Sequence, residues 1–274
     1  MTSRSSASVW MTCMTTLLRL RRRSDGPRHA SYTGRTRGPR ARWFLAFAAI
    51  VTAGPPAVAN EAEPAERSFL EQPRRLIYEG RRSGEGYFSA DGASMVFQSE
   101  RLADNPFYQI YMLDLVTGDT RQVSTGVGKT TCAFFHPDGS EILFASTHHD
   151  PRSLELQREE LDFRASGRER RYAWDYDPEM DLYAAANEPG ATPRRLTEAR
   201  GYDAEASYSP DGEWIVFTSN REAYARVLDR REQKLLETDP AYFGEIWIMR
   251  ADGSEPKRLT HTPGYDGGPF FFAD

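Results

Sequence analysis

The sequence predicts an all-β fold: a partial β-propeller of about three four-stranded blades plus the start of a fourth, with short helical insertions. Two observations support this prediction. A turn motif occurs three times in full and begins a fourth time at the last residue. A second hairpin follows each full copy, and four strands per repeat are what one propeller blade requires.

The turn motif joins the first two strands of each repeat. In Ser209-Pro210-Asp211-Gly212, Ser suits the first turn position, Pro fixes φ at the second, and Gly accepts the left-handed state at the fourth. The four aligned segments are residues 86–92, 133–139, 206–212 and 269–274. The apolar runs that follow the full copies, residues 95–97, 142–144 and 215–217, lack alternation and therefore predict strands covered on both faces.

The second hairpin supplies strands three and four of each unit. It pairs residues 110–113 with 121–124, 182–184 with 194–197, and 246–249 with 257–260. The predicted blades are therefore about 84–125, 130–198 and 204–261, with the next starting at 266–274. Residues 74–77 resemble a fourth strand with no blade before it, which could complete a blade at ring closure.

The N-terminus has the pattern of an export signal. Residues 1–59 carry 10 of the 35 Lys and Arg residues but one acidic residue, and their apolar run 43–53 precedes the small-residue site Ala57-Val58-Ala59. We expect a signal peptide with a long basic n-region at 1–59, a linker at 60–73 and an incomplete propeller at 74–274. The run is shorter than the roughly 20 residues of a membrane span, although an uncleaved anchor is the alternative. The expected location is periplasmic or secreted, without stable membrane insertion after cleavage.

Charge and cysteine content narrow the function classes. Residues 60–274 hold 25 basic and 39 acidic residues, a net charge of −14, which argues against a nucleic-acid partner. After cleavage of the signal, Cys132 is the sole cysteine, and its place in a predicted strand favours a small buried thiol.

The Ser-Pro-Asp-Gly, Phe-x-Ser, Ile-Trp-x-Met, Asp-Gly and Arg-Leu-Thr elements resemble the WD-repeat-like blades of the TolB propeller family. Similar blades form the N-terminal propellers of prolyl-oligopeptidase-type exported hydrolases. The resemblance covers about residues 74–274, and no stretch matches the separate N-terminal domain of TolB. It implies the propeller fold and, for function, a binding scaffold.

Insertions that depart from the repeat predict which face of the propeller binds a ligand. Long insertions lie between the second and third strands of two blades, at about 150–178 and 221–243; residues 222–237 of the latter could form an amphipathic helix. In an up-and-down blade these loops share a face with the loops between blades, and insertions map to binding faces. The candidate binding residues on that face are Tyr202, Asp203, Tyr265, Asp266, Trp174, Tyr176, Asp177, His148, His149 and Tyr242. Aromatic rings beside carboxylates suit peptide, glycan or cation capture. In the alternative, Tyr202 and Tyr265 pack between blades, the aspartates cap loops and the histidines are solvated.

No catalytic residue, metal site or cofactor is predicted, since the sequence holds neither a G-x-S-x-G nor an H-E-x-x-H motif. The first hypothesis is an exported, non-catalytic scaffold for a protein, peptide or envelope component. The second is the N-terminal propeller of a longer secreted hydrolase, such as a peptidase, whose catalytic domain would follow residue 274. A third is a pseudogene fragment. Three blades cannot close a ring, so we expect residues 60–274 to be poorly soluble or to self-associate through open propeller edges.

Overall fold

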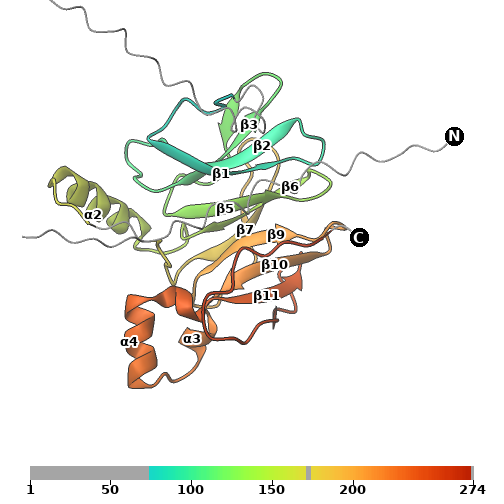
Figure 1. Cartoon of the computed structure of the whole chain (residues 1–274). Helices are drawn as coiled ribbons and strands as arrows, with labels where there is room; N and C mark the ends of the chain where they lie inside the picture. Colours follow the sequence, from blue (N-terminus) through green and yellow to red (C-terminus); the bar gives the residue numbers. More distant parts are fainter. Residues whose placement is uncertain (1–73, 171–173, 273–274) are drawn as a thin grey trace, which may run out of the picture. The chain divides into compact units, whose positions relative to one another are not determined.

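The computed structural model describes residues 74–170 and 174–272, which fall within one unit, residues 68–274. Three antiparallel four-stranded sheets follow one another along the chain and stack side by side (Figure 1). Blade 1 comprises β1 (Arg82–Phe88), β2 (Ser94–Glu100), β3 (Gln109–Asp114) and β4 (Thr120–Gln122). Blade 2 comprises β5 (Thr130–Phe135), β6 (Glu141–Ser146), β7 (Asp181–Ala186) and β8 (Arg194–Arg195). Blade 3 comprises β9 (Asp203–Tyr208), β10 (Trp214–Ser219), β11 (Glu245–Arg250) and β12 (Lys257–Arg258). Because strand order within each sheet follows the chain, the predicted all-β partial propeller is confirmed.

The repeated turn has the predicted geometry. Gly92, Gly139 and Gly212 have φ of 70°, 77° and 74°, the left-handed state that glycine adopts without strain. In each turn the glycine N–H donates to the carbonyl three residues earlier at 2.9 Å. The turn therefore fixes where each first strand reverses into the second.

The apolar second strands form the core between blades. Val96, Ile142 and Ile215 are fully buried, as the unbroken apolar runs predicted. One cluster joins β2 and β3 of blade 1 to blade 2, and another joins β6 and β7 to blade 3. Apolar burial between sheets thus holds the three blades together.

A polar clasp is also repeated at the start of each third strand. In each blade a Ser or Thr hydroxyl from the segment after the third strand accepts a hydrogen bond from a backbone N–H near the start of that strand, at 2.9 Å. The same hydroxyl donates a hydrogen bond to the side chain of the strand's first residue. The hydroxyl and acceptor pairs are Ser124 with Gln109, Thr197 with Asp181, and Thr260 with Glu245. These clasps satisfy polar groups at the sheet ends that carry the insertions.

The insertions are helical. The first holds α2 (Ser153–Ala165), and the second holds α3 (Glu222–Ala225), α4 (Arg230–Thr238) and the 3₁₀ turn η1 (Pro240–Phe243). The single helix expected over 222–237 is wrong: Arg226 is extended, and Asp229 starts a new helix with a capping box to Glu232.

Two predicted strands are not formed. Residues 74–77 are irregular, because the described chain offers them no third strand to pair with. Residues 269–272 likewise form no strand, although Ser207 of β9 donates to the carbonyl of Pro269 at 2.8 Å. The predicted signal peptide and linker lie outside the described residues.

Candidate functional site

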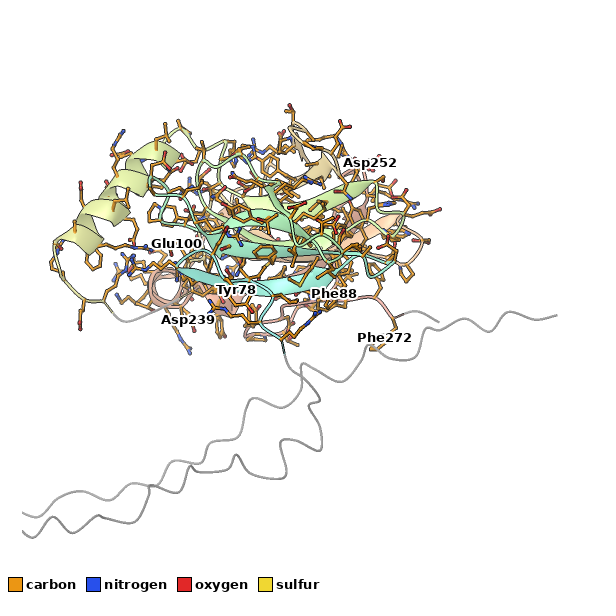
Figure 2. The ribbon with its side chains drawn as sticks, turned by 90° about the horizontal axis from the view of Figure 1, so that it is seen from above. Tyr78, Phe88, Glu100, Asp239, Asp252 and Phe272 are labelled. Carbon is orange, nitrogen blue, oxygen red and sulfur yellow. The ribbon has the colours of Figure 1, made fainter. Side chains whose placement is uncertain are left out.

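The two ends of the sheets differ as the loop lengths predicted. Helices α2, α3 and α4 lie at one end, which we call the insertion end, and the short turns after β1, β5 and β9 lie at the other (Figure 1). Figure 2 shows Glu100 and Asp239 at the insertion end and Phe88 and Asp252 at the turn end. Candidate binding residues gather at the insertion end because every insertion and every loop between blades projects there.

The first strand of each blade carries a left-handed residue at the same repeat position. Glu85, Cys132 and Glu205 have φ of 45°, 51° and 56°, and the aligned Gly268 has 62°. Strand pairing shifts register around each of the first three, so each marks a β-bulge. Positive φ at non-glycine residues is uncommon and concentrates at functional sites. Sequence reasoning missed this set, although its members all stand one residue before the aligned motif.

These bulges bring two carboxylates and a thiol together. The Cys132 thiol donates to Glu85 Oε2 at 3.1 Å. Glu205 Oε2 accepts from the Gly268 backbone N–H at 2.8 Å, from Thr218 Oγ1 at 3.0 Å, and from the Tyr265 hydroxyl. Burial raises the pKa of Glu85, and the charge of Glu205 acts in the same direction.

The thiol at this bulge is protonated. Burial, reinforced by the charge of Glu85, raises the pKa of Cys132 well above its ordinary value. A neutral, buried thiol is a poor nucleophile, in agreement with the buried cysteine that the sequence predicted.

Three of the predicted residues, Trp174, Tyr176 and Tyr202, form a cluster of aromatic side chains. Trp174 Nε1 donates to the Tyr202 hydroxyl at 2.8 Å, and the Tyr176 ring meets the Tyr202 ring edge-on at 5.0 Å. Tyr202 is buried, so it belongs to the core, as the packing alternative held. Tyr265 is 47% exposed and reaches Glu205 by its hydroxyl, which leaves its ring accessible.

The predicted aspartates are engaged in hydrogen bonds and ion pairs. Asp203 is buried and ion-paired with Arg221. Asp177 accepts from Lys129 Nζ at 2.7 Å, and Asp266 accepts from Thr262 at 3.0 Å. Each of these carboxylates thus has a partner within the chain.

The histidine pair is packed rather than solvated. His149 Nδ1 lies 2.8 Å from the Tyr183 hydroxyl, and an Arg195 N–H donates to His149 Nε2 at 3.0 Å. The ring centroid of His148 lies 4.2 Å from that of Tyr183. Burial lowers the pKa of His148 to about 4 and lowers that of His149 as well, so both rings are neutral at pH 7. Across residues 74–170 and 174–272, no group of three or more His, Cys, Asp and Glu side chains could hold a metal ion.

Tyr242 is the last predicted residue. It lies in η1, is exposed, and meets Phe243 edge-on at 5.4 Å.

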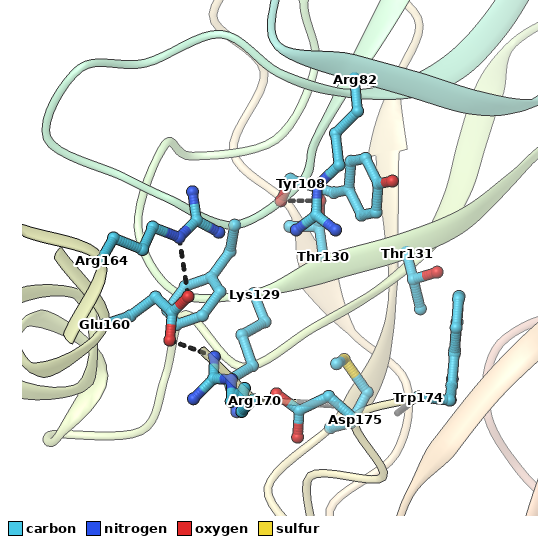
Figure 3. A pocket seen from close by; sticks show the side chains of 12 residues that line it. Arg82, Tyr108, Lys129, Thr130, Thr131, Glu160, Arg164, Arg170, Trp174 and Asp175 are labelled. Carbon is cyan, nitrogen blue, oxygen red and sulfur yellow. Dashed lines mark hydrogen bonds and ion pairs between the residues drawn. The ribbon is translucent and has the colours of Figure 1, made fainter. Parts of the chain in front are cut away.

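Sequence reasoning also missed a cavity of about 510 Å³ between blades 1 and 2, whose wall includes Arg82, Lys129 and Trp174 (Figure 3). Its lining residues come from separate segments of the chain, so no local sequence motif predicts this cavity.

Comparison with known proteins places these features in context. No family model matches the chain. An uncharacterized protein of Agrobacterium fabrum is 28% identical over 196 residues, which are 64% of this chain and 57% of that protein. The solved structure of a putative TolB from Agrobacterium tumefaciens matches 71% of this chain and 55% of its own, at 21% identity and a TM-score of 0.47. TolB from Acinetobacter baumannii matches 70% and 35%, at 17% identity and a TM-score of 0.43.

The chain resembles TolB-like propellers. A solved structure of a prolyl endopeptidase also matches, over 67% of this chain and 22% of its own, at 13% identity and a TM-score of 0.39. The chain spans little more than half the length of the Agrobacterium fabrum protein and of the putative TolB from Agrobacterium tumefaciens, 57% and 55% respectively. In the part that the structure describes, no helix has the length and apolar character needed to cross a bilayer.

Proposed function

We propose that the chain is an exported, TolB-like propeller that acts as a non-catalytic binding scaffold for a protein, peptide or envelope component. One observation carries the proposal: accessible aromatic rings and carboxylates gather at the insertion end around the three bulges. Tyr265 over Glu205, the half-buried Trp174 and Tyr176, and the exposed Asp175 offer apolar surface beside charge. Such surfaces suit recognition of polypeptide.

The scaffold proposal is tested by site-specific cross-linking in the cell envelope. A photo-reactive phenylalanine analogue at position 265 samples the insertion end, and the same residue at Val116, which is 83% exposed, samples the turn end. We expect a discrete adduct with an envelope protein or a peptide-bearing envelope polymer from position 265 and none from position 116. Adducts of equal yield from both positions, or none from 265, would count against binding at this end.

The hydrolase alternative keeps the same propeller but assigns the activity to a further domain. The chain covers 57% of its relative from Agrobacterium fabrum, so this alternative concerns the longer protein. Sequencing the DNA that follows codon 274 separates the two proposals. A downstream G-x-S-x-G or zinc-peptidase segment supports the hydrolase, whereas further blades and a stop codon support the scaffold.

Self-association through open propeller edges remains a proposal. Sedimentation of residues 60–274 tests it, and a monodisperse monomer would contradict it.

A further inference from the structure

A charged cavity of about 510 Å³ lies between blades 1 and 2 at the insertion end (Figure 3). Blade 1 contributes Arg82 and Tyr108, blade 2 contributes Lys129 and Thr130, and α2 closes one side with Glu160. Helix α2 is fixed to blade 1 because Gln157 accepts from the Gly128 N–H at 2.8 Å and donates to the Asp104 carbonyl at 3.2 Å. These two hydrogen bonds fix the position of α2 at one side of the cavity.

Four lining residues of the cavity, Arg82, Glu160, Arg164 and Arg170, belong to an alternating ladder of arginines and glutamates that the buried Glu100 completes. Arg82 lies 2.8 Å from Glu100, and Glu100 lies 2.6 Å from Arg164. Arg164 then lies 2.7 Å from Glu160, and Glu160 pairs with Arg170. We call these five residues the arginine ladder. Its three cations and two anions leave one positive charge.

The surplus charge resides at the two ends of the ladder. Arg82 and Arg170 each pair with one ladder carboxylate, and their side chains are 39% and 60% exposed. The two glutamates are almost covered, at 7% and 10%. A guanidinium has five N–H donors in a planar fork, so each terminal arginine retains donors for a ligand carboxylate.

Aromatic rings stack on two of the cations that line the cavity, Arg82 and Lys129. The Arg82 guanidinium carbon lies 4.5 Å from the Tyr108 ring centroid, and Lys129 Nζ lies 5.4 Å from that of Phe107. Trp174 lines the same cavity. A stacked guanidinium is oriented before the ligand arrives, and this orientation reduces the entropy lost on binding.

A second charged group, which the buried Asp177 makes net negative, adjoins the cavity beside the lining residues Lys129 and Asp175. Lys129 Nζ lies 2.6 Å from Asp175 and 2.7 Å from Asp177, so one cation meets two anions there. Burial lowers the pKa of Lys129, but the two carboxylates raise it more, and the lysine stays charged. This negative group repels polyanions, since like charges at short range cost free energy, and it thereby favours a ligand with one localised negative charge.

We propose that this cavity binds a peptide through a single carboxylate, which the exposed guanidinium group at one end of the ladder, Arg82 or Arg170, holds while an adjacent aromatic side chain packs on Phe107, Tyr108 and Trp174. The proposal rests on the proposed scaffold function and adds a ligand class and a site to it. The carboxylate is either an acidic side chain or a peptide C-terminus.

Four synthetic peptides test it with the full chain by isothermal titration calorimetry. Two are capped at both ends and carry Phe next to either Glu or Gln. The other two end in Phe-Ala, one with a free C-terminal carboxylate and one with an amide. We expect at least one acidic peptide to bind at least tenfold more tightly than its neutral partner, and the pair that shows the preference identifies the carboxylate source.

Matched variants locate the site. We expect either R82Q or R170Q to remove most of the tenfold preference, and the variant that does so identifies the end of the ladder that holds the carboxylate. R152Q retains the preference, because Arg152 is as exposed as Arg170 but pairs with Glu155 away from the cavity lining. R82K, which keeps the charge without the fork, covers the case in which R82Q fails to fold.

Three results would overturn the proposal: no preference for either acidic peptide, effects of both R82Q and R170Q no larger than that of R152Q, or binding of polygalacturonate as tight as that of the acidic peptides. If cross-linking from position 265 succeeds and the peptides fail, the scaffold proposal stands and the cavity proposal falls.

Discussion

The buried ion pair between Asp203 and Arg221 offers the most direct test of how blade 3 is held at the insertion end. Asp203 is fully buried at the start of β9. Arg221 Nε donates to Asp203 at 3.2 Å and to Ser219 Oγ at 3.0 Å. The guanidinium carbon also lies 5.1 Å from the Phe217 ring and 5.0 Å from the Trp247 ring.

Arg221→Ala removes the only cation that pairs with Asp203 among the described residues. Removing one partner of a buried pair costs about 3–5 kcal/mol, because the other charge stays buried without compensation. Burial already raises the pKa of Asp203 to about 6, against the lowering effects of Arg221 and Ser219. Without Arg221 this pKa rises further.

The cost therefore depends on pH. A carboxyl whose folded pKa exceeds its unfolded pKa of about 4 destabilises the protein as pH rises, by about 1.4 kcal/mol per unit until the folded pKa is reached. The variant and the wild type differ in this respect only above the wild-type pKa of about 6, which makes the pH-dependent part of the loss at most about 2 kcal/mol by pH 7.5. In Arg221→Ala we therefore expect a loss of about 3–5 kcal/mol at pH 7.5 and about 1–3 kcal/mol at pH 5.

Urea unfolding at the two pH values measures both losses. Arg152→Ala is the control: its arginine is exposed and its ion pair with Glu155 is screened by solvent, so we expect no measurable change in stability. Asp203→Asn added to Arg221→Ala should recover part of the loss at pH 7.5, since it removes the buried charge. A loss below about 1 kcal/mol at pH 7.5, or a loss of the same size at both pH values, would refute the reasoning.

Two further predictions concern the turn and the packed histidine. Gly212→Ala places a Cβ 2.4 Å from His136 Nε2 at φ 74°, whereas the Cβ of Gly92→Ala, at φ 70°, meets no atom within 4 Å. Both variants strain the turn, but only the first also clashes, so we expect Gly212→Ala to lose at least about 1 kcal/mol more stability in thermal unfolding. Equal losses would contradict this packing. NMR titration of His148 should give a pKa of about 4. Because this pKa lies below the ordinary 6.5, His148 stabilises the fold above pH 6.5, and that stability is lost as pH falls towards 4. The change is about 3 kcal/mol at most, less after solvent screening; a midpoint above 6 would contradict the burial.

The local chemistry of the repeat was sufficient to predict the blades. Ser, Pro, Asp and Gly impose one turn geometry wherever they stand in that order, and unbroken apolar runs require cover on both faces. Strand order within a blade follows from such turns, and so does the end of the sheet from which the long loops project. The packing alternative for Tyr202 was likewise available from the sequence.

Only the tertiary structure decided which residues meet at the insertion end. Glu85, Cys132 and Glu205 are separated by 47 and 73 positions, and they come together because three bulged first strands pack side by side. The arginine ladder depends in the same way on α2 lying against blade 1. Turn and strand preferences act within a few residues, whereas the pairing of distant charges depends on how the sheets stack, so the sequence alone determined the blades and the tertiary structure determined the site.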